Sequence, residues 1–210
     1  MTGDPVTEAA RAARSGSLIV FPTDTVYGLG TTPHDADATA RVFEAKRRPE
    51  HLELPILVAT IEVAHEVARF DDRADRLARA LWPGALSLVL PRTPMSAPWP
   101  LGGDADTVAV RVPAHPLARA VLAEAGPLAV TSANRSGEPP ATTCEGLREV
   151  FGDLVAVYLC EEAPLEGAAS TVLDLAHGLP AILRSGDVDA VTIARFLPAG
   201  EPLLDSPPSP

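Results

Sequence analysis

The stretch LIVFPTDTVYGLG, residues 18–30, joins a short apolar run directly to a polar, glycine-containing segment. The run over 18–21 predicts a buried strand, and Pro22 ends it because proline cannot donate to a strand ladder. In open sheets, ligands bind beyond the strand ends, where loops converge. The segment is therefore a candidate ligand site, although an ordinary turn uses the same residue types. Its candidate groups are the hydroxyls of Thr23, Thr25 and Tyr27 and the backbone of Gly28 and Gly30, which lack a Cβ.

Outward from this stretch, predicted helices and strands alternate along the chain. Apolar periodicity predicts helices over 5–14, 35–48, 60–70, 72–82, 116–125, 145–151 and 189–197. It predicts further strands over 54–59, 86–90, 107–112, 128–130, 155–159, 170–175 and 181–184, and it leaves 23–33 as a loop. This alternation is typical of an α/β or α+β fold with a sheet at its centre. We predict one domain over 1–197 and a disordered, proline-rich tail over 198–210.

The charge balance restricts the class of partner. The chain has 210 residues and a net charge of −11, from 17 basic and 28 acidic residues. That balance argues against a general nucleic-acid coat, which needs concentrated Lys and Arg, but it allows a small basic pocket for one nucleotide. No GxxxxGK[ST] phosphate loop is present, and Pro33 stands where the GxGxxG-like run from Gly28 needs its third glycine.

The cysteines and the apolar runs suggest where the protein works. The two cysteines, Cys144 and Cys160, form no CxxC or Cys/His cluster, so we expect no zinc site. We expect two free thiols in a reducing cytoplasm, with one disulfide left as the alternative. Residues 1–5 lack the basic and apolar regions of a signal peptide, and no apolar run is long enough to span a membrane. The expected location is cytoplasmic.

The densest basic patch is Lys46-Arg47-Arg48, followed by Pro49. Two interpretations of it stand equal. Three cations at the end of a predicted helix complement its macrodipole. The same cations suit a triphosphate clamp, in which Arg forks onto phosphate oxygens and Lys adds a point charge.

Four further places carry polar groups beside predicted strands. Residues 131–137 are rich in small hydroxyl and amide side chains, for which turn chemistry is the stronger interpretation and phosphate or ribose binding the weaker. Arg111 lies on the polar face of an alternating strand, where a structural ion pair is the default and anion binding the alternative. Arg184 ends a strand, and Ser170 opens one, where hydroxyls are commonly β-formers.

Six motifs, taken together and in order, carry a family resemblance. They are residues 22–30 (PTDTVYGLG), 46–49 (KRRP), 82–84 (WPG), 132–137 (SANRSG), 170–174 (STVLD) and 184–186 (RSG). With them the chain resembles the YrdC-like family of threonylcarbamoyl-AMP synthases, in its short, single-domain form. The resemblance covers about residues 17–186. It implies a twisted, mixed parallel and antiparallel sheet flanked by helices, with a deep, positively charged central cavity.

The resemblance also implies roles for individual residues. Lys46 and Arg48 would be the catalytic cations, with Mg²⁺ carried on the ATP phosphates and no metal site on the protein. The threonine ligands would be Thr25, Tyr27, Arg111 (on the carboxylate), Ser132 and Ser170. The ATP ligands would be Lys46, Arg48, Thr107, Asn134, Thr142 and Arg184.

Three positions depart from the family pattern. Asp24 stands where the family more often has Glu, which is a modest change. Leu52 stands where many members have an Asn, Lys or His that contacts the nucleotide. Leu57 stands where some members have a histidine that contacts threonine.

The implied activity is an L-threonylcarbamoyladenylate synthase, a nucleotidyltransferase. L-threonine, bicarbonate or CO₂, and ATP would give threonylcarbamoyl-AMP and pyrophosphate for the t6A modification of tRNA at position 37. The implied partners are transiently bound tRNA threonylcarbamoyl-transfer proteins, with weak contact to tRNA itself and none to a membrane.

Two other classes stay open at this point. The first is a non-enzymatic module that binds double-stranded RNA or tRNA, against which the acidic charge weighs. The second is a carbamoyl-transfer enzyme like the related domains of hydrogenase maturation proteins, whose zinc-finger and acylphosphatase modules do not fit in this chain.

Overall fold

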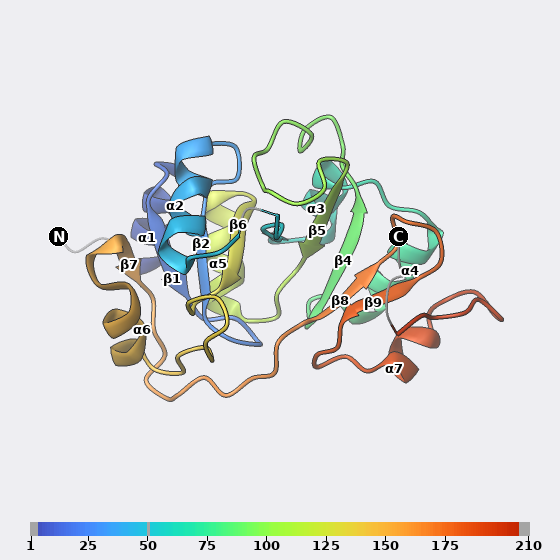
Figure 1. The fold of residues 1–210 in the computed structure, drawn as a ribbon. Helices are drawn as coiled ribbons and strands as arrows, with labels where there is room; N and C mark the ends of the chain where they lie inside the picture. The colour runs from blue at the N-terminus through green and yellow to red at the C-terminus, as the bar shows by residue number, and fades with distance from the viewer. Residues whose placement is uncertain (1–3, 50, 206–210) are drawn as a thin grey trace.

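One mixed sheet organises the computed structural model, which describes residues 4–49 and 51–205 (Figure 1). Over these residues the sheet has nine strands in the order β7-β1-β2-β6-β3-β5-β4-β8-β9. The pairs β1–β7, β3–β5 and β4–β8 are parallel, and the other neighbours are antiparallel. The strands are β1 (Leu18–Phe21), β2 (Gly28–Thr31), β3 (Ile56–Leu57), β4 (Leu86–Pro91), β5 (Thr107–Arg111), β6 (Leu128–Ser132), β7 (Val155–Tyr158), β8 (Thr171–Asp174) and β9 (Ala181–Arg184). The predicted α/β class, with a mixed sheet flanked by helices, is confirmed.

Helices pack on both faces of this sheet and divide the apolar core into two clusters. Helices α1 (Pro5–Arg14) and α5 (Pro116–Ala125) pack on one face, against Ile19, Phe21 and Val130. The other face carries the larger cluster. Its helices are α2 (Ala36–Lys46), α3 (Ile61–Val67), α4 (Asp72–Leu81), α6 (Cys144–Phe151) and α7 (Ala190–Ala194). Because α1 and α5 lie over only part of the first face, the rest of that face is free to form a cavity.

Strand β2 was predicted as part of a loop, and that prediction is wrong. Gly28–Thr31 pairs with β1 on one side and β6 on the other. Glycine is a poor β-former, so the pattern hid the strand. Its glycines make room for neighbouring side chains: a Cβ at Gly28 would lie 2.7 Å from Val130 Cγ1, and one at Gly30 would lie 3.2 Å from Phe21 Cε1.

The end of the chain also differs from the prediction. Residues 198–205, which fall in the segment predicted to be disordered, run beside the edge strand β9. Leu204 forms a parallel bridge with Ala181, and Glu201 is ion-paired with Arg73 at 3.1 Å. The pattern of prolines gave no sign of these contacts, which depend on the tertiary structure. Residues 206–210 lie outside the described residues.

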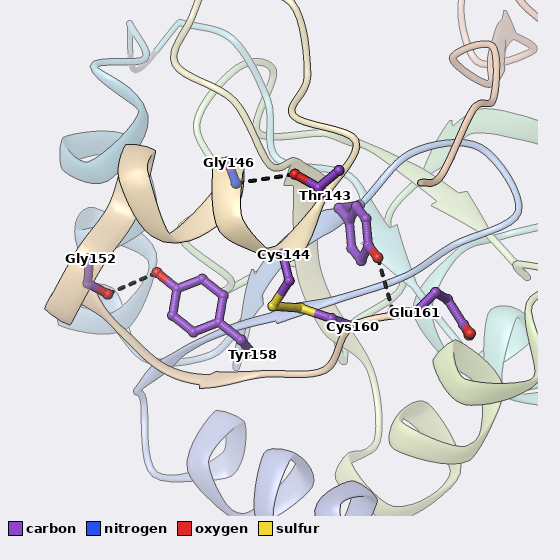
Figure 2. Close-up of a disulfide and its surroundings, with 8 residues drawn as sticks. Thr143, Cys144, Gly146, Gly152, Tyr158, Cys160 and Glu161 are labelled. Atoms are coloured by element: carbon purple, nitrogen blue, oxygen red, sulfur yellow. Dashed lines mark hydrogen bonds between the residues drawn. A yellow bond between two sulfur atoms is a disulfide. The ribbon is translucent and has the colours of Figure 1, made fainter. Parts of the chain in front are cut away.

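The two cysteines are not free thiols. Cys144, the first residue of α6, and Cys160, which follows β7, form a disulfide with their Cα atoms 5.6 Å apart (Figure 2). The alternative that the sequence left open is therefore the correct one. Within residues 4–49 and 51–205, no helix combines the length and the apolar character that a membrane crossing requires.

Candidate functional site

A cavity of about 410 Å³ lies on the sheet face that α1 and α5 leave partly uncovered. Its walls come from the β1–β2 loop, the segment after α2, the ends of β3, β5 and β6, and the segment that leads into β8. The described residues that line it are Thr23, Thr25, Val26, Tyr27, Gly28, Arg48, Pro55, Leu57, Ser87, Arg111, Val130, Thr131, Ser132, Asn134, Pro140, Gly167, Ala169, Ser170 and Arg184.

Strand register explains why residues so far apart in sequence share one cavity. Leu57 lies opposite Arg111, Gly28 lies opposite Ser132, and Val172 lies opposite Arg184. Residues directly opposite one another on neighbouring strands point to the same face of a sheet. The pairing of β2, β6, β3 and β5 therefore gathers these side chains on one side.

Arg111 is the most completely held cation of the site. Its guanidinium donates to Gly84 O (2.8 Å), Thr25 Oγ1 (3.1 Å) and Asp24 Oδ1 (2.6 Å). The Asp24 carboxylate also accepts from the backbone N–H of Ala114 at 2.9 Å. A guanidinium has five N–H donors, so two remain for a ligand. An ion pair and anion binding are the two alternatives that the sequence leaves open for Arg111, and this geometry accommodates both.

The Trp82-Pro83-Gly84 turn supplies one of these contacts. A Cβ at Gly84 would lie 2.3 Å from the carbonyl oxygen of Leu81, so only glycine fits this turn. The turn points the Gly84 carbonyl at Arg111 Nε, while the Gly84 N–H donates to Val112 O at 2.9 Å. The role of this motif is therefore to position Arg111.

The hydroxyls of the β1–β2 loop are linked to one another. Thr23 Oγ1 lies 2.9 Å from Thr25 Oγ1 and donates to Val26 O at 2.5 Å, which closes the loop on itself. Tyr27 is fully buried, and its Oη accepts from the backbone N–H of Glu161 at 3.0 Å. The loop therefore presents Thr25 beside Arg111 and holds a distant segment through Tyr27.

The three cations of the basic motif at the end of α2 lie in three different environments. The Arg47 backbone is left-handed (φ 51°) where α2 ends, and its side chain is exposed. Arg48 turns toward the cavity, and its guanidinium donates to Leu52 O (3.1 Å) and Glu53 O (2.8 Å). Leu52 thus contributes through its backbone, although its side chain departs from the family pattern.

Lys46 lies behind the cavity wall rather than in it. Its Nζ donates to Ser132 O (2.5 Å), Asn134 O (2.6 Å) and Asn134 Oδ1 (3.2 Å), so it supports two residues that line the cavity. Burial, together with the nearby charge of Arg48, lowers the pKa of Lys46 to about 8. The prediction that Lys46 faces the ligand directly needs this correction.

Ser170 connects two further groups of the site. Arg184 donates from Nε (3.0 Å) and Nη2 (2.8 Å) to Ser170 O, and from Nη2 to Ser170 Oγ at 2.9 Å. Ser170 Oγ lies 3.1 Å from Ser87 Oγ. Ser87 is not among the site residues predicted from the sequence. Its signal was a single hydroxyl in the otherwise apolar strand over 86–90.

The cavity is electropositive. Arg48, Arg111 and Arg184 line it, and none of its described lining residues is acidic. Burial is the main cause that lowers the pKa of Arg48 and Arg111, and the charge of Arg184 lowers both further. Desolvated cations with few acidic partners favour a bound anion, which suits phosphate and carboxylate groups.

Besides Lys46, two predicted ATP ligands lie outside the cavity. Thr107 begins β5 and Arg111 ends it, which separates them by about 13 Å of strand. The Thr107 carbonyl instead accepts from Arg92 Nε at 2.6 Å. Thr142 is exposed, and its carbonyl accepts from the Leu165 N–H at 2.8 Å.

The other predicted residues do line the cavity, and so does one departure from the family pattern. The predicted residues found there are Thr25, Tyr27, Arg48, Arg111, Ser132, Asn134, Ser170 and Arg184. Leu57 lies beside Arg111 and forms part of an apolar wall with Pro55 and Val130. No signal in the sequence marked Pro140, Gly167 or Ala169, because they reach the cavity from irregular segments.

Comparison with known proteins supplies the context of this site. The model of the Sua5/YciO/YrdC family, which carries the description "Telomere recombination", matches residues 11–186. A protein of Mycobacterium tuberculosis (strain H37Rv) is 44% identical over 195 residues, which cover 91% of this chain and 88% of that protein. The Bacillus subtilis (strain 168) threonylcarbamoyl-AMP synthase is 36% identical over 89% of this chain, which spans only 55% of that enzyme.

A solved structure agrees with the fold. Sua5 of Pyrococcus abyssi, in complex with L-threonine, superposes with a TM-score of 0.84 at 35% identity. The alignment covers 95% of this chain and 58% of that chain, so the present chain is little more than half as long as this relative.

Proposed function

Because this chain belongs to the Sua5/YciO/YrdC family, we propose that it is a threonylcarbamoyl-AMP synthase and that the cavity of Arg48, Arg111 and Arg184 is its active site. The observation that carries the proposal is the combination of three cations with the hydroxyls of Thr25 and Ser132 in one cavity. One end offers a carboxylate site for an amino acid, and the other offers cations for a polyphosphate.

The substrates divide between the two ends. L-threonine occupies the end where Arg111 meets Thr25, with its carboxylate on the two free N–H groups of Arg111. Tyr27, Ser132 and Ser170 form the rest of that end. ATP lies with its phosphates toward Arg48 and Arg184 and with Asn134 at its side.

The reaction needs no covalent protein nucleophile. The threonine amine is carboxylated by bicarbonate or CO₂, and an oxygen of the resulting carbamate attacks the α-phosphorus of ATP. The bond to the β-phosphate oxygen breaks, and pyrophosphate leaves. The protein contributes the position of both substrates and cations beside the charge that develops on phosphate. Arg48 makes this contact directly, whereas Lys46 acts by holding the carbonyls of Ser132 and Asn134.

Magnesium enters as a companion of ATP. The described lining residues offer hydroxyl and amide oxygens but no carboxylate. Mg²⁺ prefers phosphate oxygens and water when a protein supplies few carboxylates, so these residues fit an ion held mainly by the nucleotide. When bound, it neutralises part of the phosphate charge.

The product is an activated threonylcarbamoyl group. We place its use in the cytoplasm, where transfer proteins would deliver it to tRNA for the t6A modification. The RNA-binding alternative gains no support, because the cations lie inside the cavity, where a duplex does not reach.

The proposal predicts the product of one incubation. With ATP, Mg²⁺, bicarbonate and labelled L-threonine, we expect a labelled adenylate and one pyrophosphate per adenylate. Omission of threonine or bicarbonate should abolish both products. ATP hydrolysis without an adenylate would reject the assignment, and turnover with carbamoyl phosphate instead of bicarbonate would favour the carbamoyl-transfer class.

A further inference from the structure

One segment crosses the sheet over the cavity, and residues 159–170 form it. It leaves β7, at one edge of the sheet, and enters β8, the eighth strand in the order (Figure 1). Two of its residues, Gly167 and Ala169, line the cavity. We call this segment the strap.

The strap crosses nearly the whole width of the sheet. From β7 to β8 it crosses seven strand spacings, which amount to about 34 Å on a flat sheet. Its twelve residues reach at most about 40 Å when fully extended. Because the sheet is twisted and residues 162–163 are bent, the strap is not fully extended, and its own contacts set its position over the cavity.

The end of the strap that leads into β8 lies directly against the β1–β2 loop, which carries the proposed threonine ligand Thr25. A Cβ at Gly167 would lie 1.8 Å from Thr25 O, so the backbone there is pressed against the loop that carries Thr25. The Ala169 carbonyl accepts from the Asp187 N–H at 3.0 Å. Any shift of the strap along its length therefore changes its contact with the loop that presents Thr25.

The end of the strap next to β7 is fixed by the Leu159 N–H, which donates to Val20 O at 2.8 Å, by the disulfide and by a few polar contacts. Cys160 is bonded to Cys144, and Glu161 N–H donates to Tyr27 Oη at 3.0 Å (Figure 2). Glu161 also lies 3.3 Å from His115 Nε2. Residues 161–164 and 166–169 are exposed and belong to no helix or strand, whereas Leu165 between them packs against the larger core cluster.

The same disulfide connects a second wall of the cavity. Cys144 directly follows residues 133–143, a segment that contributes Asn134 and Pro140 to the lining. The strap also contacts this segment directly, because the Leu165 N–H donates to Thr142 O at 2.8 Å. One covalent bond thus couples two irregular walls of the site.

We propose that Cys144 and Cys160 are positioning residues: their disulfide holds the strap and residues 133–143 in the arrangement that binds threonine, so threonine affinity depends on the oxidation state of this pair. Both cysteine residues are partly exposed. A dithiol reductant transfers two electrons, the S–S bond breaks to two thiols, and the dithiol becomes its own disulfide. Disulfides of cytosolic proteins are typically transient and redox-sensing, which agrees with such a role.

The test compares the oxidised chain, the chain reduced with dithiothreitol, and the Cys144→Ser/Cys160→Ser double variant by calorimetric titration with L-threonine. We expect the reduced chain to bind threonine about fivefold more weakly, equivalent to about 1 kcal/mol. The double variant should behave as the reduced chain with or without reductant. Equal threonine affinity of the oxidised and reduced chains would overturn the proposal, as would a double variant that binds like the oxidised chain.

Because the calorimetric test rests on the proposed function, a second readout is independent of any substrate. Amide hydrogen exchange should accelerate in residues 161–169 upon reduction and stay unchanged in α5, which the disulfide does not touch. Absence of threonine binding in both redox states would refute the proposed function, and the exchange result would then decide the role of the disulfide by itself. Unchanged exchange of the strap would refute that role.

Discussion

Replacement of Arg48 by alanine should reduce the rate of pyrophosphate release more than a hundredfold, which corresponds to about 3 kcal/mol of barrier. Arg48 faces the cavity with its guanidinium held on Leu52 O and Glu53 O, near Arg184. Its charge is therefore preorganised where negative charge builds up on the phosphates, and the site has few other cations to replace it. The measurement is the steady-state rate of pyrophosphate release with all substrates saturating.

The neighbouring arginine provides a matched control. Arg47 has the same charge but is exposed, and its backbone is left-handed. Arg47→Gly removes the side chain and relieves a conformation that costs a non-glycine residue about 1 kcal/mol. We expect this variant to retain activity within about twofold and to unfold at the same or a higher temperature. A rate of Arg48→Ala within tenfold of the wild type would count against the role of Arg48.

The second large effect concerns threonine. Arg111→Lys should weaken L-threonine binding by about fiftyfold, or roughly 2.3 kcal/mol, although it conserves the charge. A single ammonium cannot reach Gly84 O, Thr25 Oγ1 and Asp24 Oδ1 together and still present two parallel donors to a carboxylate. The measurement is the dissociation constant for threonine by calorimetry.

ATP binding by the same sample separates a local effect from unfolding. The Arg111→Lys protein should bind ATP within about threefold of the wild type, because Arg48 and Arg184 are unchanged. Arg119→Lys, on the exposed side of α5, serves as the matched control and should leave both affinities unaltered. Threonine affinity that survives Arg111→Lys would show that the carboxylate binds elsewhere.

The local pattern of the sequence predicts most of the fold. Apolar runs such as 18–21 and 86–90 became strands because buried strands need little beyond β-branched and aliphatic side chains. Strand β2 was missed because glycine is a poor β-former. Gly28 and Gly30 are needed because a Cβ at these positions would come too close to Val130 and Phe21, which belong to other strands. Such a requirement is visible only after the strands are paired.

The site residues that belong to sequence motifs could be predicted. The site residues that reach the cavity from irregular segments could not. Thr25, Arg111 and Arg184 were selected from the sequence, and they share the cavity. Thr107 was assigned to ATP, but strand direction places it at the wrong end of β5. Lys46 is the last residue of α2, and the position of that helix directs its side chain to the Ser132 carbonyl behind the cavity wall. The motif itself does not reveal this direction.

The strap and its disulfide left no periodic signal at all. Residues 161–169 have neither helical nor strand periodicity, and the spacing of two cysteines does not determine whether they pair. The strap lies over the cavity because the strand order places β7 at one edge of the sheet and β8 next to the other edge.

The most direct test is a crystal structure with L-threonine and an ATP analogue whose α,β-bridge resists cleavage. We expect both ligands in the one cavity, with the threonine carboxylate on Arg111, its amine toward the α-phosphate, and the polyphosphate on Arg48 and Arg184. Threonine bound away from Arg111, or a nucleotide bound outside this cavity, would contradict the account.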